Sequence, residues 1–151
     1  MVALSNKGAS VEALKHVLAD TYLMVINTQN VHWNMEGPGF IAIHKLLDEQ
    51  YEDLSEAVDE IAERIRALSE VSPASFSELL ALARVEERKK AIQDVNEGIR
   101  FLVEGHEKVS QLLTEHIEVL DQDNDAGTID LLTDRVRIHD KFAWLLRANL
   151  A

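Results

Sequence analysis

Apolar residues recur every three or four positions along most of this chain, the spacing that places them on one face of an α-helix. The pattern predicts four long helices and one short one, at residues 11–35, 41–68, 76–83, 85–120 and 128–149. Ser10 is a candidate N-cap for the first helix. The second helix should end before Ser72 and Pro73, because the residue before a proline avoids the helical conformation.

Two interruptions separate these helices. Residues 36–39 contain two glycines and a proline, which cannot continue a helix cheaply, and residues 121–127 form a polar turn. No segment alternates like a strand or repeats with the period of a solenoid. We therefore expect an all-α protein, a four-helix bundle with the short helix in its one long crossover connection. The chain suits a single domain, 1–151, with residues 1–10 as a short N-terminal tail.

The composition limits the classes of protein and partner. With 46% hydrophobic and 28% charged residues, the chain is ordinary for a soluble globular protein. No apolar run approaches the roughly 20 residues of a membrane-spanning helix, and residues 1–10 do not resemble a signal peptide, so a cytoplasmic location is expected. The absence of cysteine excludes thiolate ligands and leaves nitrogen and oxygen to hold any metal. A net charge of -12 repels nucleic acid and anionic membranes and attracts cations.

Four residues with metal-binding side chains share one face of the second predicted helix. At about 100° per residue, His44, Asp48, Asp59 and Glu63 fall within about 100° of one another. The apolar stripe of the same helix, which includes Leu54, lies to one side of them. Within one bundle, this polar face therefore looks toward solvent or toward a neighbouring subunit.

Spacing along the helix divides these residues into two pairs. His44 and Asp48 are one turn apart, as are Asp59 and Glu63, but about 22 Å of helix separates His44 from Asp59. One ion cannot reach both pairs in one chain. Two copies of the helix, packed antiparallel about a two-fold axis, would bring the pairs together, with His32 supplied by the end of the first helix. Two imidazoles and three carboxylates suit Fe(II), although solvation alone would explain any one of these side chains.

The sequence around these residues resembles that of a known family. The stretch that carries the resemblance is His32-Trp-Asn-Met-Glu-Gly-Pro-Gly-Phe40, followed by His44, Asp48, Tyr51, Asp59 and Ala62-Glu-Arg64. Ser72-Pro-Ala-Ser-Phe76 and His139-Asp-Lys-Phe-Ala-Trp-Leu-Leu-Arg147 are similar too. Over residues 11–150 the chain resembles the Dps family, the DNA-binding proteins from starved cells within the ferritin-like superfamily. Both histidines of the first stretch and the later acids match the family's ferroxidase motif.

The resemblance implies an enzyme, a ferroxidase, in a hollow homo-dodecamer with iron sites at its two-fold interfaces. The catalytic metal ligands would be His32, His44, Asp48, Asp59 and Glu63. Oxidation of Fe(II), typically by hydrogen peroxide and otherwise by dioxygen, would leave a stored Fe(III) mineral and protect against oxidative damage. Zinc or manganese is an alternative metal for such ligands.

The same resemblance implies roles for other residues. Trp33 and Tyr51 would lie near the site, where aromatic rings can intercept stray oxidising equivalents, or would simply pack. Asp125, Asp130 and Asp134 would line iron-entry pores at three-fold axes. Capping of a helix N-terminus and interaction with its dipole explain these three acids equally well.

The remaining four histidines match no ligand position. We expect surface or packing positions for His16, His106, His116 and His139. No histidine in the chain follows a glutamate by three positions, which disfavours a di-iron site within one bundle.

Binding to DNA is expected to be weak or absent. Family members that bind DNA commonly use a mobile basic tail, whose lysines reach the phosphates. Here Lys7 is the only basic residue before Val11, and no basic extension follows the last predicted helix. The alternative function is a nucleoid-compacting DNA-binding or structural oligomer, with a nucleoid-associated location and with acids that are merely solvated.

Overall fold

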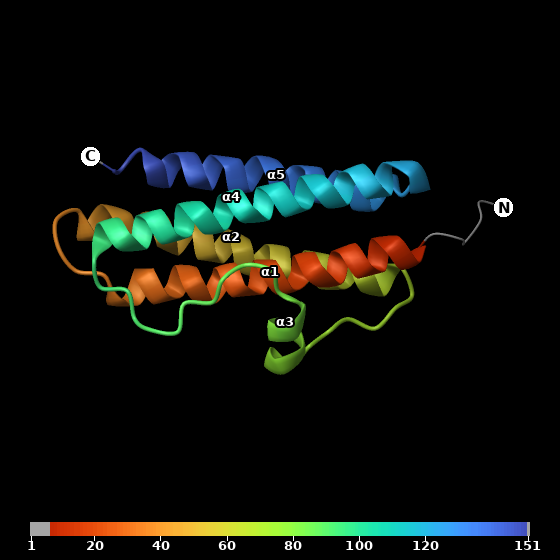
Figure 1. Cartoon of the computed structure of the whole chain (residues 1–151), viewed down its shortest axis with the longest axis horizontal. Coiled ribbons are helices and arrows are strands. Elements are labelled where there is room, and N and C mark those ends of the chain that lie inside the picture. The colour runs from red at the N-terminus through yellow and green to blue at the C-terminus, as the bar shows by residue number, and fades with distance from the viewer. Residues whose placement is uncertain (1–6, 151) are drawn as a thin grey trace.

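Four long helices pack side by side in a bundle, and a short helix lies outside it (Figure 1). The computed structural model describes residues 7–150. Its elements are α1 (Lys7–Asn34), α2 (Phe40–Ala67), α3 (Phe76–Leu82), α4 (Val95–Leu120), the 3-10 turn η1 (Asp121–Asp123) and α5 (Ala126–Arg147). No strand is present among residues 7–150. The predicted all-α bundle, with a short helix in the crossover between α2 and α4, is confirmed.

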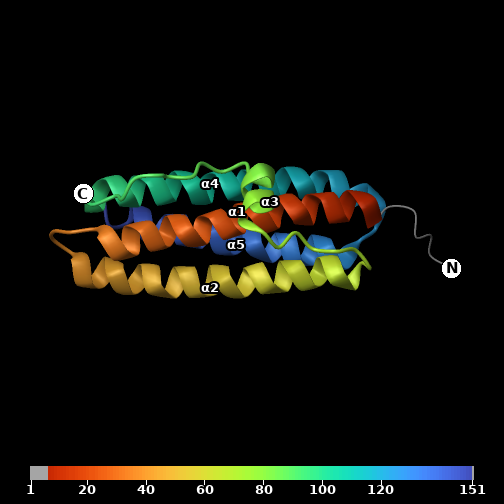
Figure 2. The same cartoon turned by 90° about the horizontal axis from the view of Figure 1, so that it is seen from below.

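Helices that follow one another in the chain form the closest pairs. α1 packs against α2, α4 packs against α5, and contact between α1 and α4 joins the pairs; Figure 2 shows α2 and α4 at opposite edges of the bundle. Leu14, Leu54, Leu102 and Leu132, one from each long helix, are fully buried at 0% exposure. Burial of these apolar faces is the main stabilising contribution. None of the helices within residues 7–150 is both long and apolar enough to cross a lipid bilayer.

The first helix starts earlier than the apolar pattern predicts. Residues 7–10, expected as part of a tail, are already helical, and Ser10 is buried inside α1 instead of forming its N-cap. Ala9 packs against the core, so tertiary packing extends the helix beyond its periodic apolar stripe. The rest of the predicted tail, residues 1–6, lies outside the described residues.

The prediction for the start of the fourth helix was wrong: α4 begins at Val95, not at Val85. Val85 and Ile92 are buried, but they belong to a non-helical segment, residues 83–94, which we call the crossover strap. Asp94 is the N-cap of α4, and its side chain accepts a hydrogen bond from the backbone N–H of Glu97. Val85 and Ile92 are seven positions apart, a spacing that fits a helix as well as it fits an extended segment anchored at two points. Periodicity alone therefore could not distinguish these two structures.

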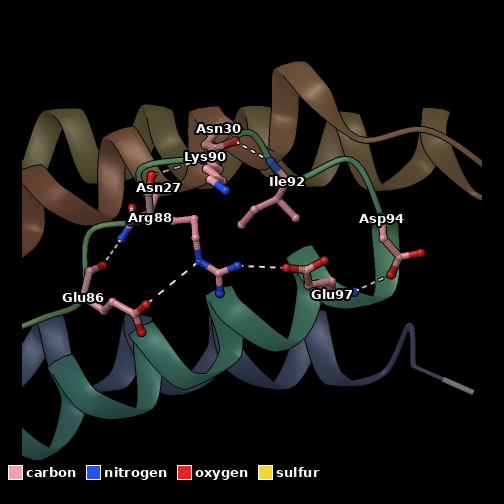
Figure 3. A network of polar contacts seen from close by, with 8 residues as sticks. All are labelled: Asn27, Asn30, Glu86, Arg88, Lys90, Ile92, Asp94 and Glu97. Carbon is pink, nitrogen blue, oxygen red and sulfur yellow. Dashed lines mark hydrogen bonds and ion pairs between the residues drawn. The ribbon is translucent and has the colours of Figure 1, made fainter.

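Side chains of α1 hold the crossover strap in place (Figure 3). Asp20 accepts hydrogen bonds from the backbone N–H groups of residues 84 and 85. Asn27 donates to the carbonyl oxygen of Glu86 at 2.8 Å and accepts from the backbone N–H of Arg88 at 3.3 Å. Asn30 bonds in the same way to backbone groups of residues 90 and 92. These bonds satisfy backbone groups that would otherwise need a helix or sheet.

Replacing Asn27 with alanine should loosen this attachment. The change removes both hydrogen bonds that the buried Asn27 side chain makes to the strap, at a cost of about 0.5–1.5 kcal/mol each. We expect the midpoint of thermal unfolding to fall by several degrees. Asn149→Ala is the matched control, because its amide bonds a carbonyl on the exposed surface. Equal midpoints for the two variants would contradict the role assigned to Asn27.

Candidate metal centre

A tight turn brings the end of α1 against the start of α2. Residues 35–39 form it, and Gly37 and Gly39 adopt φ angles of 116° and 81°, a conformation that residues with a Cβ rarely take. The helices run antiparallel from this turn, so His32 and His44, twelve residues apart, face each other at one end of the bundle.

The imidazole ring of each of His32 and His44 forms a hydrogen bond with the backbone of the other residue. Nδ1 of His32 lies 2.8 Å from the carbonyl oxygen of His44, and Nδ1 of His44 lies 2.9 Å from that of His32. A carbonyl oxygen only accepts, so each Nδ1 carries a proton and each neutral ring keeps a lone pair on Nε2. The rings stack, with centroids 3.8 Å apart and planes 11° from parallel. Both side chains are therefore set in the tautomer that binds metal through Nε2.

Burial favours the neutral form of His32. Burial first, and then the neighbouring His44, lower the pKa of His32 below its ordinary value of 6.5. Asp48, one turn beyond His44, places Oδ1 3.9 Å from Nε2 of His32. Three of the five predicted ligands therefore lie at one end of the bundle, with Asp48 just beyond hydrogen-bonding distance of His32.

Aromatic rings pack around the two histidines. Tyr51 meets the ring of His32 edge-on, with centroids 5.2 Å apart, and its hydrogen bond with Asp48 raises the pKa of Tyr51. Phe40 stacks on His44 at 5.0 Å. Sequence reasoning missed Phe40, although its position one helical turn before His44 was a usable signal. Trp33, the other aromatic residue predicted near the site, is 61% exposed.

Asp59 and Glu63 do not join this group. Both are exposed on α2, and about 22 Å of helix separates His44 from Asp59. Among residues 7–150, no three histidine or acidic side chains form a group that could hold a metal ion. A single chain therefore presents the predicted ligands as an incomplete set.

An apolar groove borders Asp59. It has a volume of about 680 Å³ and lies between α1, α2 and the chain around the start of α3, where Tyr22 and Phe76 line it. The side chains of Ile26, Leu80 and Phe76 on this side are 44%, 50% and 79% exposed. Contiguous exposed apolar surface of this kind commonly marks an interface.

The three acids predicted to line a pore lie around the start of α5. Asp125 is the N-cap: it accepts hydrogen bonds from the backbone N–H and hydroxyl of Thr128 and pairs with Arg64 at 2.7 Å. Burial raises the pKa of Asp125, but the bonds from Thr128 and the cation of Arg64 outweigh it and bring the pKa below 3.8. Asp125 therefore caps α5, and its place in a pore stays a prediction. Asp130 and Asp134 are exposed and line a cleft of about 430 Å³.

The remaining histidines pack within the fold. Nδ1 of His16 lies 2.9 Å from the carbonyl oxygen of Leu82, and the ring of His16 lies parallel to that of His116 at 6.3 Å. His106 and His139 are completely buried, with their Nδ1 atoms 2.9 Å apart. Sequence reasoning did not predict that these two would meet. The position of each histidine on the apolar face of its helix, α4 or α5, was the one sequence feature that could have indicated their burial.

Comparison with known proteins defines the class of the chain. Residues 11–151 match the family model described as "Ferritin-like domain". A solved Dps structure from Vibrio cholerae O1, described as a member of a broad superfamily of ferritin-like diiron-carboxylate proteins, superimposes with a TM-score of 0.90 at 31% identity. The match covers 97% of this chain and 92% of that one. The protein is therefore a ferritin-like four-helix bundle.

Two curated relatives match nearly the whole of this chain. The DNA protection during starvation protein of Helicobacter pylori is 29% identical over 140 residues, which cover 93% of this chain and 97% of that protein. A low temperature-induced protein of a Nostoc species is 35% identical over 139 residues, which cover 91% of this chain and 78% of that protein. The chain belongs to the Dps family of ferritin-like proteins, as the sequence motif predicted. Iron storage is the general function that this membership supports.

Proposed function

We propose that this protein oxidises Fe(II) at sites shared between two subunits and stores the Fe(III) product as a mineral inside a homo-dodecamer. Hydrogen peroxide is the proposed oxidant, so the reaction also removes peroxide and limits oxidative damage. The observation that carries this proposal is the reciprocal bonding of His32 and His44 through Nδ1, which leaves the Nε2 lone pair of each ring free, that of His32 at 3.9 Å from Asp48.

The rest of the ligand set has to come from a second copy of the chain. Asp59 and Glu63 are exposed on α2, too far from His44 to share an ion with it in one chain. When two α2 helices pack antiparallel about a two-fold axis, the same surface of each subunit meets its copy. The apolar groove beside Asp59 offers surface that such contact would bury. Each site would combine His32, His44 and Asp48 with Asp59 and Glu63 of the partner subunit.

This ligand set suits the oxidation of iron. Imidazole nitrogens bind Fe(II), and carboxylates stabilise the higher charge of Fe(III). Two Fe(II) ions would each give one electron to one hydrogen peroxide, whose O–O bond breaks, and two protons would complete two water molecules. Zinc or manganese, which accept the same ligands, would compete with iron for the site.

Neighbouring residues have supporting roles in this proposal. Tyr51 touches His32 and bonds Asp48, so its phenol lies where it can give an electron to a stray oxidant. Trp33, adjacent to His32 in the chain, is proposed for the same task. Asp130 and Asp134 present exposed carboxylates that would attract Fe(II) toward an entry pore.

Mixed assemblies test whether the site is shared. One variant carries His32→Gly and His44→Gly, the other carries Asp59→Ala and Glu63→Ala, and each alone should lack fast oxidation. In a mixed dimer, one of the two sites combines intact histidines from one subunit with intact acids from the other. Random reassembly should therefore restore about a quarter of the wild-type rate, because about half of the dimers are mixed. Stopped-flow absorbance of Fe(III) measures the rate.

Each variant reassembled with itself is the control and should regain nothing. A mixture no faster than these controls would contradict a shared site. A wild-type rate in the Asp59→Ala/Glu63→Ala variant alone would show that these acids are not ligands.

A nucleoid-compacting or structural oligomer is the other candidate. The net charge of -12 opposes binding to DNA, and such a function has no use for histidines held with free Nε2 atoms. A gel shift that persists at physiological ionic strength, together with no oxidation of iron, would favour this candidate.

A further inference from the structure

A layer of polar side chains crosses the middle of the bundle, where apolar side chains otherwise fill the core. It comprises Gln50 from α2, His106 from α4, and Arg135 and His139 from α5, and we call it the polar core layer. The exposed fractions of these residues are 1%, 0%, 3% and 0%. None of them belongs to the proposed iron site.

The contacts between α2 and α5 place Gln50 in this layer. The two helices run antiparallel, and Asp53 of α2 pairs with Arg135 of α5 at 2.9 Å. Gln50 lies about one turn before Asp53, and His139 lies about one turn after Arg135. Gln50 and His139 are therefore level with each other along the bundle.

Several polar atoms of the layer have no hydrogen-bond partner among residues 7–150. Apart from the two atoms that form the ion pair between Arg135 and Asp53, they are both amide atoms of Gln50, Nε2 of His106, Nε2 of His139 and Nε of Arg135. A buried polar atom left without a partner destabilises a fold by at least as much as a hydrogen bond stabilises it. Five such atoms would cancel much of the stability of an ordinary domain. The layer must therefore have further partners.

The histidine pair makes the layer both a donor and an acceptor. The Nδ1 atoms of His106 and His139 are 2.9 Å apart, so one of them donates to the other. With both rings neutral, the donating ring has a bare Nε2 and the accepting ring carries an Nε2–H. Gln50 likewise offers both an amide oxygen and amide N–H groups.

We propose that ordered water occupies the polar core layer and bridges His106, His139 and Gln50. Water both donates and accepts, which matches the mixed set of free atoms. An anion would leave the amide oxygen and the bare ring nitrogen unsatisfied. A metal cation would lie near the guanidinium of Arg135 and would face an Nε2–H. Because Asp53 already pairs with Arg135, the layer calls for a neutral partner.

Whether replacement of Gln50 lowers or raises the thermal midpoint tests this proposal. Methionine has nearly the shape of glutamine but lacks its amide. If water bridges Gln50 to the histidines, Gln50→Met breaks the bridge, and the thermal midpoint of the assembled protein should fall by several degrees. If the layer is dry, the same change removes two unsatisfied atoms. An unchanged or higher midpoint would then overturn the proposal. Leu54→Met, one turn along the same buried face, is the matched control.

A crystal structure of the assembled protein provides a second, independent test. The map should show water within hydrogen-bonding distance of the Gln50 amide and of Nε2 of His106 or His139. Crystals soaked in bromide and in zinc would give an anomalous peak at this position if an anion or a cation were the real occupant. Either peak, or a map with no density in the layer, would overturn the proposal.

Discussion

Replacing His32 and His44 together by glycine is expected to slow the oxidation of Fe(II) at least about 100-fold while the assembled particle persists. Residues that merely support a metal ligand often contribute about 10- to 100-fold in metal affinity, and this variant removes two ligands outright. Stopped-flow absorbance after addition of hydrogen peroxide, and separately of dioxygen, measures the rate. Comparison of the two oxidants also tests the proposed preference for peroxide, and size-exclusion chromatography checks the particle.

Two further variants separate loss of ligands from loss of structure. Lys45→Ala with Glu49→Ala changes two exposed residues of α2 near His44 and should keep the wild-type rate. His32→Gln with His44→Gln keeps a side-chain donor on each helix but removes the imidazole lone pairs, so it should be as slow as the glycine variant. A wild-type rate in either histidine variant would rule out these residues as ligands.

Acidification is expected to destabilise the protein through its buried histidine pair. Burial, and then the cation of Arg135, lower the pKa of His106 to about 3, and burial, His106 and Arg135 lower the pKa of His139 too. The unfolded chain binds these protons near pH 6.5. The contribution of His106 to stability is therefore complete above about pH 6.5 and is lost as the pH falls toward 3. The expected slope is about 1.4 kcal/mol per pH unit for one such histidine.

Chemical denaturation at a series of pH values below about 6.5 measures this slope. His106→Gln with His139→Gln removes both titrating rings while keeping amides that hydrogen-bond, and it should flatten the dependence. Arg135, its partner Asp53 and the neutral Gln50 face the pair and are left unchanged. Asn149→Ala, which changes an exposed residue and removes no titrating group, is the control and should keep the wild-type slope. Identical slopes for wild type and the double variant would contradict the prediction.

The two predictions concern separate parts of one subunit. On α2 they use different faces, because Asp48 and Gln50 are two residues and therefore about 160° apart around the helix, Asp48 partly exposed and Gln50 buried. The histidine pair itself lies on α4 and α5, which carry no residue of the proposed iron site. Loss of iron oxidation in the glycine variant should therefore leave the pH dependence of stability intact. The glutamine variants of the core pair should, in turn, still oxidise iron near neutral pH.

The predicted helix bounds are accurate where the local sequence pattern determines the segment, and wrong where contacts with distant residues determine it. The range 41–68 for α2 agrees with the structure to within one residue, because an uninterrupted apolar stripe runs between two breaks. The start of α4 was wrong, because Val85 and Ile92 are apolar and helically spaced although they anchor the crossover strap. The side chain of Asn27, which bonds that strap, lies 59 residues before its partner carbonyl. A local pattern contains no information about such a contact.

For the candidate site, the sequence predicted which residues share a helix face, and the structure agrees that Asp59 stands apart from His44. It did not predict the reciprocal bonds of His32 and His44, nor the stacking of Phe40. It also left capping and pore-lining as equal explanations for Asp125, and the hydrogen bond that Asp125 accepts from the backbone N–H of Thr128 shows the capping.

By itself, the sequence determined the helical class of the protein, and it predicted that a second subunit completes the proposed ligand set. Both follow from local geometry, because a helix turns by about 100° and rises about 1.5 Å per residue whatever surrounds it. Only the tertiary structure decided which ring nitrogens of His32 and His44 are free, and that His106 and His139 form a polar layer inside an apolar bundle. These outcomes depend on hydrogen bonds between different helices, and such bonds exist only once packing has set the distances between their atoms.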